Sequence, residues 1–146
     1  MIKVSEYMTQ DPITLDVDHR VYHAYATMEL YRIRHIPILN DDGHLVGIVS
    51  DRDLKKHIHD AFDEDSQKFS NFELMHTRLE DLMTSDLKTS IPSADLADVA
   101  SFMLQERISS MPIVAADNNQ KLIGILTDSD LLNVLVSLLK RPIELD

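Results

Sequence analysis

The sequence predicts a mixed α+β fold in which two β-α-β-β-α repeats, related by a pseudo-two-fold axis, pack sheet to sheet. Three observations lead to this prediction: an internal duplication, the same order of strand and helix patterns in each copy, and the small size of one copy. A copy of about 60 residues has an unfavourable surface-to-volume ratio, so each copy is expected to bury its sheet against the other.

The duplication is visible in short motifs that recur in the same order. Met8-Thr9-Gln10-Asp11 recurs as Met83-Thr84-Ser85-Asp86, an offset of 75 positions (83 − 8). Further motif pairs are Ile36-Pro37-Ile38 with Met111-Pro112-Ile113 and, after a loop two residues longer in the second copy, Leu45–Leu54 with Leu122–Leu131. Six of the ten residue pairs in the last match are identical, which chance does not produce.

The first half of each copy predicts a strand and a helix. An extended stretch around Thr14 or Thr89 precedes a helix-start signal at Asp18 or Ser93. Apolar residues then recur with helical spacing: Val21, Tyr25 and Met28 in the first copy, and Leu96, Val99, Ala100, Met103 and Leu104 in the second.

The second half of each copy predicts a hairpin and another helix. Ile36–Leu39 and Met111–Val114 are typical of short buried strands, with a proline tolerated near the strand start. Turn residues follow, then apolar runs that end at Val49 and Leu126, and then helices that begin at Ser50 and Thr127. We therefore divide the chain into a first repeat (1–60), an acidic and apolar linker (61–76) and a second repeat (77–146).

Composition excludes several classes of protein. The chain has 146 residues, 44% hydrophobic and 27% charged, close to the globular average. Its 14 basic and 25 acidic residues give a net charge of −11, which argues against a primary nucleic-acid or membrane partner. It contains no cysteine, no signal-peptide pattern and no apolar run long enough to cross a bilayer. We expect a soluble, cytoplasmic protein.

A second helix start in each copy carries polar residues that suit a ligand. Ser50 and Thr127 lie where free backbone N–H groups favour an anion or a polar oxygen, and Asp53 and Asp130 offer acceptors for a vicinal ribose diol. The same Ser/Thr-x-x-Asp pattern is also a capping box, which needs no ligand. Gly47 and Gly124, just before, allow close approach of a ligand or of another backbone.

Taken together, these motifs resemble the tandem CBS-domain module, the cystathionine-β-synthase-type pair also called a Bateman module. The resemblance covers almost the entire chain, with both copies in the expected order. It implies a regulatory module that binds an adenosine-containing ligand (AMP, ADP, ATP or S-adenosylmethionine) in clefts between the two copies, with no obligatory cofactor.

The resemblance also implies which residues bind the ligand. They are Thr14, Arg34, His35, Ile36, Pro37, Ser50 and Asp53 in the first copy, and Thr89, Met111, Pro112, Thr127 and Asp130 in the second. In family members that bind nucleotides, including the regulatory gamma subunit of the AMP-activated kinase, basic residues before the middle strand meet phosphates. Only the first copy has them, because Ser109 and Ser110 replace Arg34 and His35.

Other functions have weaker signals. His19 and His23 have the i, i+4 spacing of metal ligands, but no third ligand is evident, so we expect no metal site. No glycine-rich phosphate loop and no nucleophile–base arrangement is present, so we expect no catalysis.

Two interpretations therefore stay open. One is a nucleotide sensor that signals to a separate effector protein or through its own oligomer, and the alternative is a ligand-free dimerisation or docking module. In either case we expect a homodimer, because the apolar stretch from Leu131 to Leu139 exceeds what one chain is expected to cover.

Overall fold

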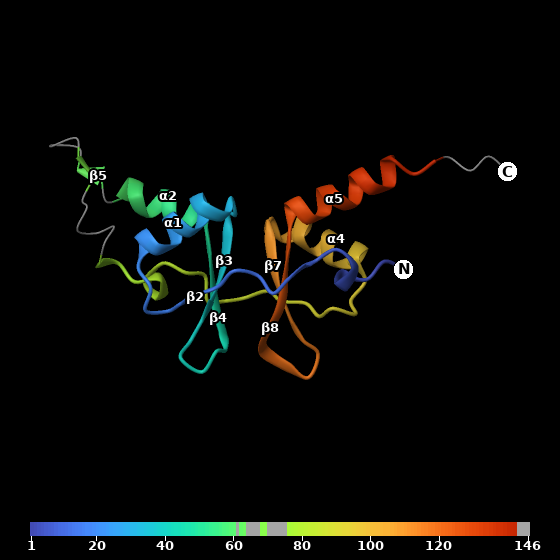
Figure 1. Ribbon diagram of the computed structural model, residues 1–146, viewed down its shortest axis with the longest axis horizontal. Helices are drawn as coiled ribbons and strands as arrows, with labels where there is room; N and C mark the ends of the chain where they lie inside the picture. The colour runs from blue at the N-terminus through green and yellow to red at the C-terminus, as the bar shows by residue number, and fades with distance from the viewer. Residues whose placement is uncertain (61, 64–67, 70–75, 143–146) are drawn as a thin grey trace. The chain divides into compact units, whose positions relative to one another are not determined.

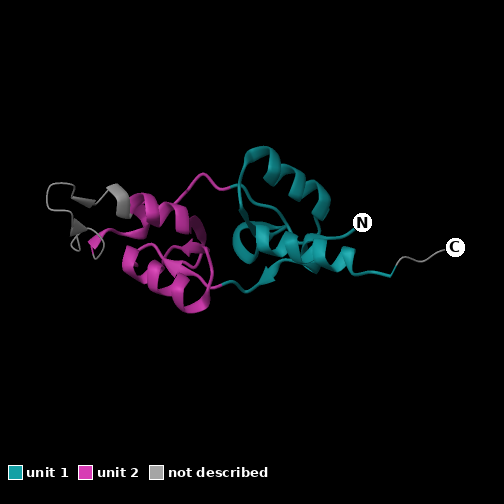
Figure 2. Ribbon diagram, turned by 90° about the horizontal axis from the view of Figure 1, so that it is seen from above, with its two compact units in different colours: residues 1–12, 88–146 teal, residues 13–87 magenta. Residues whose placement is uncertain are grey.

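The computed structural model describes residues 1–60, 62–63, 68–69 and 76–142, with the side chains of 58–60, 62–63 and 68–69 left aside. Its described residues form two compact units that exchange segments of the chain (Figure 2). One unit, here called the first-repeat unit, comprises residues 13–87, and the second-repeat unit comprises 1–12 and 88–146. The boundaries differ from those of the sequence repeats because the start of each repeat folds with the body of the other.

The first-repeat unit contains a three-stranded sheet of order β2-β3-β4, formed by Leu15–Asp16, His35–Leu39 and Leu45–Ser50. Strand β3 pairs parallel with β2 and antiparallel with β4. Helices α1 (Val21–Tyr31) and α2 (Asp51–Asp60) lie together on this sheet, as Figure 1 shows. They share one core because alternate residues of β3 and β4 face α1 and α2. The buried members of that core are Val21, Ala24, Met28, Ile36, Ile38, Val49, Leu54 and Leu79.

The second-repeat unit repeats this plan with a sheet of order β1-β8-β7, formed by Thr9–Gln10, Asn118–Thr127 and Ser110–Ala115. A parallel bridge from Ser90 to Ile113 takes the place of the β2–β3 pairing. Helices α4 (Leu96–Glu106) and α5 (Asp128–Leu139) complete the unit (Figure 1). Its core consists of Val4, Leu96, Val99, Met103, Met111, Ile113 and Leu126. The predicted α+β class with duplicated strands and helices is thus confirmed, with two three-stranded sheets and four α-helices among the described residues.

The exchanged segments begin with matched 3-10 turns, η1 (Val4–Glu6) and η2 (Leu79–Asp81). Val4 is fully buried in the second-repeat unit, and Leu79 is fully buried in the first-repeat unit. The Met-Thr motif that follows each turn then pairs with the returning strand of the same unit, as Thr9 opposite Ile125 and Thr84 opposite Ile48.

These exchanged segments correct the predicted helix starts. Helices α1 and α4 begin at Val21 and Leu96, not at Asp18 and Ser93. The backbone N–H of Val21 donates to the Thr77 carbonyl (3.0 Å), and that of Leu96 donates to the Ile2 carbonyl (2.8 Å). Asp18 and Ser93 lie in turns, and the incoming segment pairs with Arg20 and Asp95, which are extended and cap the two helices.

The predicted linker falls mostly outside the described residues. Its backbone is described only at the antiparallel pair β5 (Phe62–Asp63) and β6 (Lys68–Phe69) and at residue 76. Of its predicted acidic and apolar residues, those outside the description are Glu64, Asp65, Phe72, Leu74 and Met75.

Candidate functional site

The predicted ligand-binding residues separate cleanly between the two units. The first-repeat unit contains Thr14, Arg34, His35, Ile36, Pro37, Ser50 and Asp53. The second-repeat unit contains Thr89, Met111, Pro112, Thr127 and Asp130. Each set lies on the sheet, next to its strands and at the start of the last helix of its unit.

The middle-strand isoleucine, methionine and prolines of the two sets are buried. Ile36, Pro37, Met111 and Pro112 are among the largest fully buried side chains, so they build the cores beneath the candidate sites. Thr14 is half-buried and Thr89 is exposed, which leaves their hydroxyls nearer to solvent.

The N-terminus of α2 forms a reciprocal cap. The Ser50 backbone N–H donates to Asp53 Oδ2 (2.8 Å), and the Asp53 backbone N–H donates to Ser50 Oγ (3.2 Å). The predicted capping box is therefore present. In the part of the chain that the structure describes, that backbone N–H is the only donor to the Asp53 carboxylate. Because a carboxylate has about four acceptor positions, most of them are available to a ligand.

A basic pair lies beside this helix start. His35 is opposite Ser50 in the β3–β4 register, and the Asp51 backbone N–H donates to the Arg34 carbonyl (2.9 Å). Arg34 is exposed, His35 is half-buried, and each contacts another group of the protein. The first-repeat unit thus brings a carboxylate and two basic residues to one end of its sheet.

The N-terminus of α5 has the same backbone but a fuller set of hydrogen bonds. Asp130 Oδ2 accepts from the Thr127 backbone N–H (2.9 Å) and from Thr127 Oγ1 (3.1 Å), while Asp130 Oδ1 accepts from Thr9 Oγ1 (3.1 Å). Asp130 is only 9% exposed. Ser109 and Ser110 stand where the other unit has its basic pair, and the Asp128 N–H donates to the Ser109 carbonyl (3.0 Å).

Neither glycine before these helices is left open for a ligand. A Cβ at Gly124 would lie 2.7 Å from the Thr9 backbone oxygen and 2.9 Å from Met8 Sδ. A Cβ at Gly47 would overlap the Met83 side chain, with Met83 Cγ at 2.8 Å. Of the two predicted reasons for glycine, close approach of another part of the chain is the one that the structure contains.

Two hollows occur in the second-repeat unit. One, of about 200 Å³, is lined by Thr89, Ser90, Asp98, Val99, Phe102 and Met111. Its lining includes two predicted ligand-binding residues, Thr89 and Met111, together with Asp98 and Phe102. The sequence did not indicate Asp98 and Phe102, because the aligned residues of the first copy are His23 and Thr27 and no repeated motif marks these positions.

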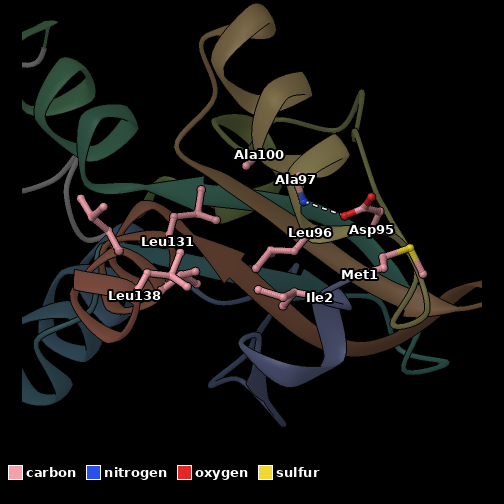
Figure 3. Close-up of a pocket in the computed structure, with 10 residues that line it drawn as sticks. Met1, Ile2, Asp95, Leu96, Ala97, Ala100, Leu131 and Leu138 are labelled. Atoms are coloured by element: carbon pink, nitrogen blue, oxygen red, sulfur yellow. Dashed lines mark hydrogen bonds between the residues drawn. The ribbon is translucent and has the colours of Figure 1, made fainter. Parts of the chain in front are cut away.

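The other hollow, of about 500 Å³, is an apolar groove between the start of α4, the chain start and α5 (Figure 3). Ala97 and Ala100 leave it open, whereas the aligned positions of the first copy are Tyr22 and Tyr25. Leu131, Leu135 and Leu138 form its α5 wall.

The predicted histidine pair has a capping role. The Asp16 backbone N–H donates to His19 Nδ1 (2.8 Å), and the Arg20 backbone N–H donates to His23 Nδ1 (3.0 Å). The two rings lie edge to face with centroids 4.8 Å apart. Burial, and then the neighbouring His19 and Arg20, lower the pKa of His23 below its ordinary 6.5. Among the described residues no three side chains are grouped as metal ligands.

The sequence profile of the CBS domain matches residues 4–60 and 79–137, which together make up most of the chain. The chain belongs to the CBS-domain family. The two matches start at the exchanged turns, so each CBS domain spans a segment of one unit and the body of the other.

Solved structures agree with a CBS-domain pair. The chain is 35% identical to a Vibrio cholerae protein named for acetoin utilization (AcuB), with a TM-score of 0.79 over 96% of this chain and 94% of that one. It is 25% identical to CBSX2, solved in complex with AMP, with a TM-score of 0.78 over 96% of this chain and 100% of that one.

Enzymes also occur among the relatives. The chain is 30% identical over 130 residues to inosine-5′-monophosphate dehydrogenase of Methanocaldococcus jannaschii. That match covers 89% of the chain but only 23% of the enzyme, so the chain spans less than a quarter of that relative. Within the described residues, no helix is long and apolar enough to cross a membrane.

Proposed function

We propose that this CBS-domain pair is a regulatory, non-catalytic module that binds an adenosine-containing ligand and signals its presence to a partner or through its own oligomer. The observation that carries the proposal is the arrangement at the start of α2, where the Asp53 carboxylate lies at the same end of the unit as Arg34 and His35. A carboxylate suits a ribose diol, and a guanidinium with an imidazole suits a phosphate.

AMP is the ligand that we favour within this class. CBSX2, similar to this chain over its whole length, was solved with AMP. A chain of net charge −11 repels polyanions, so ATP would require a metal ion or further neutralisation, whereas AMP, ADP or cationic S-adenosylmethionine would not. The other predicted residues, Thr14 beside β2 and the main chain of Ile36 and Pro37, complete the proposed site in the first-repeat unit.

A thermal-shift panel tests the proposal. It comprises adenosine, AMP, ADP, ATP with and without magnesium, S-adenosylmethionine and NAD, on the wild type and on Arg34→Ser, which gives the first repeat the residue of the second. At 100 times its dissociation constant a ligand adds about 2.7 kcal/mol, a shift of several degrees. We expect AMP to stabilise the wild type and to stabilise Arg34→Ser less, while adenosine stabilises both equally. No shift with any ligand at millimolar concentration would contradict the proposal and favour a ligand-free docking module.

We also propose that the signal passes through a homodimer, formed by the groove of Figure 3 and the exposed face of α5. Leu132, Leu135 and Leu139 are 61%, 49% and 74% exposed. No charged residue occurs from Leu131 to Leu139, so two chains can meet along this part of α5 without bringing like charges into contact. Leu135→Glu should give a monomer by light scattering, whereas Leu30→Glu on α1 (74% exposed) should not. A wild-type monomer would contradict this part. The proposal further includes a separate effector protein as a partner and a cytoplasmic location.

A further inference from the structure

We infer that Thr9 determines which unit recognises ribose, because its hydroxyl occupies the acceptor position on Asp130 that a ribose hydroxyl would use. This inference rests on the proposed function and deepens it. Asp53 in the first-repeat unit then recognises the ribose, whereas Asp130 in the second-repeat unit does not.

Most acceptor positions of the Asp130 carboxylate are already occupied. Thr127 supplies two donors to Oδ2, and Thr9 supplies one to Oδ1. A carboxylate accepts about four hydrogen bonds, so about one position is left, and a vicinal diol needs two. Asp130 is also 9% exposed, so little of its carboxylate faces solvent.

The Asp53 carboxylate, in contrast, has most of its acceptor positions open. Among the described residues, the Ser50 backbone N–H is its one donor, so about three positions stay open. Thr84 is the residue aligned with Thr9 and pairs with Ile48 through both of its backbone groups (2.9 and 3.0 Å). Its hydroxyl makes no hydrogen bond to Asp53 in the described part of the chain.

Thr9 is held in place by its backbone and not by its side chain. It lies opposite Ile125 in the β1–β8 pairing, and its carbonyl oxygen lies against Gly124. Its side chain is exposed, so replacing it alters the hydroxyl contact with Asp130 while leaving the strand pairing intact. Removing this hydroxyl should therefore open an acceptor on Asp130 without displacing β1.

Calorimetric titration with AMP and with 2′-deoxy-AMP tests the inference on four proteins: wild type, Thr9→Ala, Thr9→Ser and Thr84→Ala. We expect the wild type to have one stronger site that prefers AMP over 2′-deoxy-AMP and a second, weaker AMP site. Thr9→Ala should tighten AMP binding at a second site by about three- to tenfold, the factor that one hydrogen bond supplies, with a smaller gain for 2′-deoxy-AMP. Thr9→Ser keeps the hydroxyl, and Thr84→Ala is the matched change in the other unit, so both should behave as the wild type.

Other outcomes separate this inference from the proposed function. Two equal AMP sites in the wild type, or a second site that is unchanged or weakened in Thr9→Ala, would overturn the role of Thr9 and leave AMP binding standing. No AMP binding by any of the four proteins would overturn the proposed function and this inference together.

Discussion

The starts of α2 and α5 come from the same duplicated motif, and comparing them separates what the backbone fixes from what the side chains change. Both have a Ser/Thr-x-x-Asp capping box. In both, the first helical N–H donates to a carbonyl just before the middle strand, from Asp51 to Arg34 (2.9 Å) and from Asp128 to Ser109 (3.0 Å). Yet Asp53 has one donor in the described structure, whereas Asp130 has three. The Asp53 carboxylate therefore has more open acceptor positions than the Asp130 carboxylate.

Steric contact gives the largest predicted difference between the units. Gly124→Ala would press a methyl group against the Thr9 backbone oxygen, whereas Gly47→Ala would meet the movable Met83 side chain. Overpacking costs about 1–3 kcal/mol, so we expect Gly124→Ala near the upper limit and Gly47→Ala near the lower. Urea unfolding of both variants measures the two losses of stability. Equal losses would show that the β1 backbone moves away from a methyl group as readily as the Met83 side chain does.

The carboxylates give the next difference. Asp130→Ala leaves the Thr127 backbone N–H and two threonine hydroxyls without their acceptor, so it should lower the free energy of unfolding by about 2 kcal/mol. Asp53→Ala removes only the acceptor of the Ser50 backbone N–H and should cost about 1 kcal/mol. Unfolding in the absence of ligand is the appropriate measurement. If Asp53→Ala were the more destabilising change, the assignment of stability to Asp130 would be wrong.

The smallest predicted difference depends on pH and arises at the start of α1. The folded pKa of His23 is lowered, so neutral His23 contributes stability fully above its unfolded pKa of about 6.5 and loses it as the pH falls toward the folded pKa. His23→Gln keeps an uncharged acceptor for the Arg20 N–H. The melting temperature of the wild type relative to His23→Gln should therefore fall from pH 7.5 to pH 5.5. A constant difference over this range would exclude the histidine cap as the cause.

Much of the fold could be predicted because its signals are local and occur twice. The duplicated strands, the helices after Ser50 and Thr127, and both capping boxes are found where the motifs indicate. Local signals could not show that Val4 and Leu79 enter the core of the unit that the other repeat builds, which is also why the predicted starts of α1 and α4 were wrong.

Part of the candidate site could not be predicted for the same reason. Thr9 was visible as half of the recurring Met-Thr motif, but its bond to Asp130 joins residues 121 positions apart. The sequence separation conceals such a pair until the strand pairing is known. The role of each predicted ligand-binding residue stays a prediction.

A titration of the ¹⁵N-labelled chain with AMP, followed by backbone amide shifts in NMR, tests the central claim most directly. The account predicts that the largest shifts occur in the first-repeat unit, at Arg34, His35 and the residues from Ser50 to Asp53, and that the aligned residues Ser109, Ser110 and Thr127 to Asp130 shift less. Larger shifts at the start of α5, or no shifts at millimolar AMP, would contradict it.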